Sequence, residues 1–346
     1  MPDEKFELAV GPLFHGKYDI FISAILEFHE VMKKKLSKSV FGGKSALLIA
    51  ISLLASAFSA RATGDGARAY FLAPVNVSLL TGYAISIRGN QSFDIPVTIG
   101  IDANVNAQVV QLSRTMGIGS FIVAPFLVVP FGEFEGTLHS GSFHLRQKSA
   151  GLGDIQLGVA VGLFGAPPMT PAEYLKYDPG LTIGIFGKLI MPTGDYSNHR
   201  FINLGSNRWT GQIGFPITYY RGNSLFDKTL TTFELVPSVW IFGDNRNPFH
   251  ANSRGQAPLL QIEGHITQNI CRMLWVSIDG FYIYGGSTSA DGVSANNTQS
   301  GGSLGATIGV IPDKHLSFKF NYESILARNN NVPNGHLFKL LVTLSF

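Results

Sequence analysis

Cysteine, charge and long apolar segments are all scarce in this chain of 346 residues. Its single cysteine, Cys271, excludes a disulfide within the chain and a cysteine-based zinc site. Charged residues make up 14% of the sequence, against about 25% in a typical soluble domain, so few charges are left for a solvated surface. Because no apolar run of about 18 residues follows residue 62, a bundle of transmembrane helices is not expected.

The basic balance of the whole sequence, with a pI of 8.8, does not indicate a nucleic-acid partner. Residues 63–346 hold 18 Lys or Arg against 17 Asp or Glu. The excess positive charge lies mostly in one N-terminal run: Lys33, Lys34, Lys35, Lys38 and Lys44. That run belongs to a targeting segment.

Residues 32–62 have the three parts of a secretory signal peptide. The basic stretch after Met32 is followed by the apolar residues 46–58, and Ala60-Arg61-Ala62 supplies the small residues that signal peptidase requires. We predict cleavage between Ala62 and Thr63. An uncleaved anchor is the alternative, although the apolar stretch is short for a transmembrane helix.

Residues 1–31 precede this signal and have no export character, since they carry six acidic residues. We predict that translation starts at Met32 and that residues 1–31 are an upstream extension. Residues 63–74 are expected to form a periplasmic segment or a small plug. Residues 75–346 are expected to form the folded domain.

The apolar residues, 45% of the sequence, recur at alternate positions after residue 75. Such alternation is typical of β-strands, whose successive side chains point to opposite faces. In residues 153–164, for example, Ile155, Leu157 and Val159 share one face. The faces of the second and third runs are mixed and stay unassigned. We count twelve runs: 75–89, 105–116, 119–131, 153–164, 180–192, 207–220, 230–243, 258–269, 272–285, 302–311, 315–326 and 336–346.

The connections between these runs alternate in length, as they do in outer-membrane barrels. Those after even-numbered runs are short, such as Gly117-Ile118 and Ile270-Cys271, except for 165–179, where a short helix is expected from Pro171. The long connections are 90–104, 132–152, 193–206, 244–257, 286–301 and 327–335. An even number of strands also returns both termini to the periplasmic side. The pattern predicts an all-β fold, a transmembrane antiparallel up-and-down barrel of about twelve strands with periplasmic termini.

The last run ends on an apolar residue in mid-strand. In a soluble domain such an end would leave an apolar edge exposed, whereas in a barrel it closes against the first strand. The run resembles the C-terminal signal that the barrel-assembly machinery recognises, so we expect that machinery as a partner. Its apolar face consists of Phe338, Leu340, Val342, Leu344 and Phe346.

Alternation also places a mixed set of polar side chains in the lumen. They are structural filler or they line a passage and set its selectivity, and the sequence leaves both open. The candidates for selectivity are Arg88, Lys188, Arg208, Gln212, Glu234, Glu263, His265, Lys319 and Glu323.

No residue pattern indicates an enzyme, a cofactor or a metal. The nine histidines lack metal-ligand spacing. Glu263 and His265 share a face only because alternation puts i and i+2 together. Gly301-Gly302-Ser303-Leu304-Gly305 opens a strand and not the helix that a phosphate-binding loop needs.

Several segments resemble the outer-membrane transporter family named for the meta-pathway of phenol degradation. They include residues 66–70, 151–154 and 163–173, and most specifically Asn203-Leu204-Gly205-Ser206-Asn207-Arg208-Trp209. The resemblance covers about 66–346 and extends to the insert at 165–179. It implies a channel in the outer membrane of a Gram-negative bacterium, surrounded by its lipid, for small hydrophobic or aromatic solutes. The alternative is a structural or adhesive barrel that displays long external loops without solute flux.

Overall fold

A computed structural model describes residues 64–93, 99–140 and 143–346. The predicted extension at 1–31, the signal peptide at 32–62 and the cleavage residues Ala60, Ala62 and Thr63 lie outside the described residues. Among the described residues, no helix is long and apolar enough to cross a membrane.

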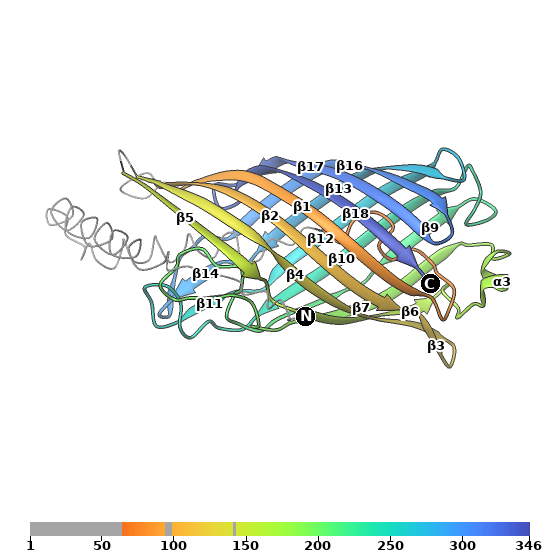
Figure 1. Ribbon diagram of the computed structural model, residues 1–346, viewed down its shortest axis with the longest axis horizontal. Coiled ribbons are helices and arrows are strands. Elements are labelled where there is room, and N and C mark those ends of the chain that lie inside the picture. Colours follow the sequence, from red (N-terminus) through yellow and green to blue (C-terminus); the bar gives the residue numbers. More distant parts are fainter. Residues whose placement is uncertain (1–63, 94–98, 141–142) are drawn as a thin grey trace, which may run out of the picture. The chain divides into compact units, whose positions relative to one another are not determined.

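The chain folds into a closed antiparallel barrel of twelve strands, which confirms the predicted fold class (Figure 1). Two barrel strands are each built from two segments, β5 with β6 and β8 with β9. The strands of the wall are β1 (Ser78–Phe93), β2 (Ile99–Arg114), β4 (Phe121–Ser140), β5 (Phe143–Leu152), β6 (Gln156–Phe164), β7 (Leu181–Ile190), β8 (Thr210–Gly214), β9 (Ile217–Arg221), β10 (Thr231–Phe242), β12 (Leu259–Asn269), β13 (Leu274–Gly285), β16 (Gln299–Asp313), β17 (Leu316–Arg328) and β18 (Asn334–Ser345).

The first and last strands close the barrel. β1 pairs with β18 over twelve positions, from Leu79 with Ser345 to Asn90 with Asn334. At its end, Ser78 N–H donates to Phe346 C=O at 2.7 Å, and Phe346 N–H donates to Ser78 C=O at 3.0 Å. The chain end that looked like an exposed edge is therefore fully paired.

The two faces of the wall are reversed relative to a soluble protein. On β12, the inward Gln261, Glu263 and His265 are buried, whereas the outward Leu260 and Ile266 are exposed. Buried polar groups require partners inside the barrel, and exposed apolar groups require lipid outside. The outward side chains of Phe338, Leu340, Leu344 and Phe346 follow the same rule.

Two connections predicted as long loops are largely strand. Residues 132–140 belong to β4 and residues 143–152 form β5, and much of 90–104 extends β1 and β2. In the β4–β5 hairpin, Glu133 pairs with Lys148 and Glu135 with Arg146, at 2.6 and 2.7 Å. Charged residues, not apolar ones, occupy the alternate positions here, so a search for alternating apolar residues does not predict these strands. The loop at 286–301 likewise contains β14 (Thr288–Ala290) and β15 (Val293–Ser294), and β14 pairs with β11 (Arg254–Gln256).

The opposite end of the barrel carries the short connections. β3 (Met116–Ile118), α3 (Pro171–Tyr174) and the C-terminus lie there, away from β5, β11 and β14 (Figure 1). The predicted short helix at Pro171 is present as α3. It begins with a capping box, in which Glu173 N–H donates to Thr170 Oγ1 and Glu173 Oε2 accepts from Thr170 N–H. Short turns mark the periplasmic side of outer-membrane barrels, so we assign this end to the periplasm.

Candidate functional site in the barrel lumen

The structure places eight of the nine candidate lumen residues on the inside of the barrel. Lys188, Arg208, Gln212 and Lys319 line an internal cavity, and Glu234, Glu263, His265 and Glu323 are buried in the wall. Whether they set selectivity stays a prediction.

Arg88 does not lie inside. Tyr83 and Ile85, five and three residues earlier, line the lumen, so Arg88 falls on the outward face of β1, where it is exposed. It pairs with the equally exposed His336 near the external end of the barrel. There the outward face has left the apolar band, so it carries polar residues that alternation assigns to the lumen by mistake.

Residues 64–74, called the lumen segment below, run inside the barrel, where polar side chains of the wall bind the segment's backbone. Glu263 Oε2 accepts from Gly66 N–H at 3.2 Å, and Glu234 Oε2 accepts from Arg68 N–H at 2.8 Å. Lys319 Nζ donates to Ala67 C=O at 2.9 Å, and Lys339 Nζ donates to Gly64 C=O at 2.8 Å. Carboxylates thus meet N–H groups and ammonium groups meet carbonyls, so the charges in this wall match the backbone dipoles.

Side chains of the segment add contacts on β7. Asp65 Oδ1 lies 3.1 Å from Lys188 Nζ, and Tyr70 donates to Asp65 Oδ2 at 2.6 Å. The Tyr70 ring stacks on Phe186, with ring centroids 5.1 Å apart. Phe186 is itself buried. The segment is therefore held by an ion pair and by an aromatic stack.

The side chain of Arg68 extends from the segment to β12 and β13. Its Nε donates to Thr267 Oγ1 at 2.9 Å, and one terminal nitrogen donates to Asn269 Oδ1 at 2.8 Å. The guanidinium also lies 4.5 Å from the ring centroid of Trp275. Hydrogen bonds combined with an aromatic face are the usual surroundings of an arginine that is held in one orientation.

A small apolar cluster at the periplasmic end holds the other end of the segment. Leu72 packs there with Tyr220, Leu225 and Leu230. Leu72 N–H donates to the Tyr220 hydroxyl at 3.2 Å, and Leu72 C=O accepts from the Tyr174 hydroxyl at 2.9 Å. The long connection at 165–179, which broke the predicted pattern of short turns, thus supplies α3 to hold the lumen segment.

A buried network lies behind the segment on β12 and β13. His265 Nδ1 is 2.8 Å from Asp279 Oδ1, and Ser277 donates to the same carboxylate oxygen at 2.6 Å. A nucleophile requires its hydroxyl to bond the histidine, whereas here the hydroxyl bonds the acid. The three side chains are at most 5% exposed, so the network is enclosed in the wall and stiffens it.

An internal cavity of about 700 Å³ lies beside the lumen segment. It is bounded on one side by the segment, and largely by β1, β2, β4, β6 and β7 on the other. Small and apolar side chains dominate this second wall: Ile85, Val109, Ile122, Phe126, Val128 and Ala160. The lumen is therefore divided into a charged half occupied by the segment and an apolar half that is hollow.

Arg208 lies at the external mouth of this cavity. One of its terminal nitrogens donates to Gln256 Oε1 at 2.6 Å, and its guanidinium lies 4.7 Å from the Phe242 ring centroid. Burial lowers the pKa of Arg208 to about 10, so it remains a cation at neutral pH. No group of His, Cys, Asp and Glu fit for a metal ion occurs in the described part of the chain.

Sequence reasoning missed how the lumen segment is held. An alternation pattern is read from side chains alone, whereas the wall side chains bind mostly backbone N–H and C=O groups of residues 64–68. The usable signal was the early stretch Gly66-Ala67-Arg68-Ala69-Tyr70, which resembled the family while lying before the first strand.

Comparison with known proteins agrees with this architecture. Residues 86–335 match the model of the family described as "Putative MetA-pathway of phenol degradation". Among solved structures, the chain is similar to an outer membrane channel from Pseudomonas putida F1, with a TM-score of 0.66 and 17% identity over 83% of this chain and 100% of that one. It is less similar to the β domain of the Bordetella autotransporter BrkA, with a TM-score of 0.47 and 12% identity over 78% of this chain and 100% of that one. No curated protein matches the chain. The fold is that of outer-membrane β-barrels.

Proposed function

Because the chain belongs to the family described for the MetA-pathway of phenol degradation, we propose that it is an outer-membrane channel for small hydrophobic or aromatic compounds. The residues 64–74 act as its internal plug. The chain is proposed to have no catalytic role.

The observation that carries this proposal is the division of the lumen. A cavity of about 700 Å³ is within the range of binding sites for small organic molecules, about 300–1,000 Å³. Its wall of β1, β2, β4 and β6 offers apolar contact, which favours solutes with apolar surface over sugars or ions. The phenyl and alkyl groups on Phe126, Val128 and Ile122 match such solutes.

The proposal that the lumen segment acts as a plug rests on how the segment is bound. Its hydrogen bonds go to Glu234, Glu263, Lys319 and Lys339 on one side of the lumen. On β7 the segment also contacts Lys188 and Phe186, so the apolar wall left to contact a solute is that of β1, β2, β4 and β6. A solute would therefore move between the segment and this wall, and a larger one would require the segment to shift.

Among the predicted lumen residues, Arg208 and Lys188 are proposed to influence selectivity, because both line the cavity at its charged rim. Gln212, which also lines it, has a role in packing, since its amide donates to Ser238 Oγ at 3.0 Å. Glu234, Glu263, His265, Lys319 and Glu323 are proposed to hold the segment or its supporting network.

The test is single-channel recording of residues 63–346 refolded into planar bilayers. Conductance blocked by small aromatic compounds, together with slower uptake of those compounds in a deletion strain, supports the proposal. Conductance that is blocked by no aromatic or apolar compound contradicts the solute class.

The alternative function, a structural or adhesive barrel, predicts neither conductance nor uptake. The tall β4–β5 hairpin would then act as a display surface. Absence of both signals in a correctly folded barrel would favour this alternative over a channel.

A further inference from the structure

Two glycines lie side by side on the lipid-facing surface of the barrel. Gly264 on β12 pairs with Gly280 on β13, and both alternate with inward residues, so both face outward. The same outward row continues to Leu235 on β10 and to Leu304 on β16, which pair with Gly264 and Gly280 respectively. Two adjacent side chains are thus missing from an otherwise apolar row.

Neither the backbone nor local crowding requires glycine at these positions. Gly264 and Gly280 are not among the glycines with positive φ. A Cβ on Gly264 would come no closer than 3.8 Å to Glu234 C=O, and one on Gly280 no closer than 3.9 Å to Gly264 C=O, which are ordinary contacts. Glycine inside a strand lowers stability and often marks a place where a ligand approaches closely. The missing side chains therefore serve to leave space.

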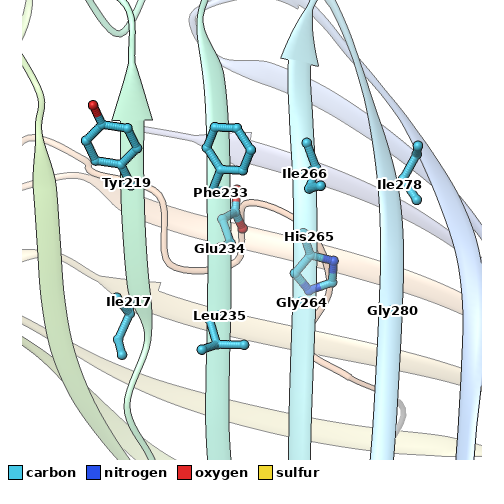
Figure 2. Close-up of a pocket in the computed structure, with 10 residues that line it drawn as sticks. All are labelled: Ile217, Tyr219, Phe233, Glu234, Leu235, Gly264, His265, Ile266, Ile278 and Gly280. Atoms are coloured by element: carbon cyan, nitrogen blue, oxygen red, sulfur yellow. The ribbon is translucent and has the colours of Figure 1, made fainter.

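That space is a groove of about 390 Å³ on the outside of β9, β10, β12 and β13. Tyr219, Phe233, Ile266 and Ile278 form one bank, and Ile217 and Leu235 continue its floor beside the glycines (Figure 2). Glu234 and His265 lie behind the strands and point into the barrel (Figure 2). The groove thus presents apolar side chains and bare backbone outward.

The groove lies in the periplasmic half of the membrane. Its residues on β10, β12 and β13 lie two to six positions from the periplasmic ends of these strands, which are Thr231, Asn269 and Leu274. At ~3.3 Å per residue and a tilt of about 40°, this places it roughly 5–15 Å above those ends, inside an apolar band about 25 Å tall.

We propose that this groove is a binding site for one acyl chain of a phospholipid from the periplasmic leaflet. The groove is continuous with the lipid-facing surface, so hydrocarbon already surrounds it. It carries no outward charge or hydrogen-bonding side chain apart from the Tyr219 hydroxyl, which lies on the bank nearer the headgroups and suits an interfacial position. An acyl chain seated there gains close contacts along a concave wall that a flat barrel surface does not provide. This binding does not depend on whether the barrel conducts solutes.

The test is native mass spectrometry of the full barrel extracted in mild detergent and titrated with palmitoyl-oleoyl phosphatidylethanolamine. Gly264→Leu fills the groove with a side chain for which the backbone has room. Gly187→Leu is the matched control, because Gly187 also faces outward with nothing within 4 Å of its Cβ position, between Val159 and Ile213. Heat-modifiable electrophoretic mobility verifies folding, and Gly264→Ala serves as a milder second variant.

The wild type and Gly187→Leu are expected to retain one phospholipid more than Gly264→Leu, with Gly264→Ala showing weaker retention than the wild type. Equal lipid retention in all four proteins overturns the proposal. Wild-type dimers that dissociate in Gly264→Leu also overturn it, because a second copy would then occupy the groove.

Discussion

The carboxylate of Glu263 accepts a hydrogen bond from the backbone N–H of Gly66 at 3.2 Å, although 197 positions separate the two residues. Glu263 also accepts from Gln261 Nε2 at 2.6 Å and lies 3.6 Å from His265 Nε2. One buried carboxylate therefore joins the wall network to the segment that runs through the lumen.

Replacing this charge should loosen the plug. Glu263→Gln keeps the size and one acceptor oxygen but loses the charge-assisted part of the bond, which is worth about 1 kcal/mol or more. A loss of about 1.4 kcal/mol raises the fraction of displaced segment roughly tenfold. Single-channel recording should show more frequent or larger openings. Glu133→Gln, which removes a charge from the exposed pair with Lys148, is the control and should leave conductance unchanged.

Filling the apolar wall should restrict passage. Ala160 lines the cavity on β6, whereas its neighbour Val159 faces outward and is 39% exposed. Ala160→Phe is expected to slow uptake of small aromatic compounds roughly tenfold, because the added ring occupies much of a cavity of about 700 Å³. Val159→Phe adds a ring to the lipid face of the same strand and should have no effect. Equal uptake by both variants would argue that solutes do not use this wall.

Alternation predicted the inward and outward faces correctly for strands whose lumen face is polar. On β12, Gln261, Glu263 and His265 oppose outward apolar residues, and the sequence alone predicts which face is which. On β2 and β4 it did not, because their inward residues, such as Val109 and Phe126, line the hollow apolar half of the lumen. The ambiguity of the second and third runs was thus a property of the site itself.

The rest of the site depends on contacts between distant residues that carry no periodic signal. The bond from Lys319 Nζ to Ala67 C=O joins positions 252 apart and ends on a backbone atom, which is the same in every residue. The α3 insert was visible in sequence as a Pro-rich exception, but its contact with Leu72 was not. The fold could therefore be predicted from the local sequence pattern, whereas the course of residues 64–74 through the lumen could not.

The contact between α3 and the lumen segment should weaken at alkaline pH. Burial raises the pKa of Tyr174 from 10.0 to about 12 while its hydroxyl donates to Leu72 C=O. Because the pKa of Tyr174 is higher when the segment is docked, the protonated hydroxyl stabilises the docked state fully below pH 10. This stabilisation is lost as the pH rises from about 10 to about 12, since a phenolate cannot donate a hydrogen bond. Protease access to the segment should increase in that range. Tyr174→Phe should show the increased access already at neutral pH and lack that alkaline step.

The terminal phenylalanine is expected to govern assembly. Phe346 is 69% exposed on the outward face, and its backbone forms both closing hydrogen bonds with Ser78. Because Phe346→Ala preserves those backbone bonds, a loss of folded protein in the outer membrane would reflect lost recognition by the assembly machinery and not lost pairing. We expect a several-fold smaller heat-modifiable band in cells. Leu326→Ala, at an equally exposed outward position, is the control and should assemble normally.

The mature N-terminus is predicted to be Thr63, immediately before the first residue that the lumen binds. Gly64 C=O accepts from Lys339 Nζ at 2.8 Å, and the next residue, Asp65, pairs with Lys188 at 3.1 Å. Cleavage after Ala62 would give a segment that starts one residue before its first contact with the lumen wall. Intact-mass measurement of the protein from outer membranes should match residues 63–346. Ala62→Leu should abolish that mass, because the site then lacks its small residue. Peptides from residues 1–31 in the precursor would contradict a start at Met32.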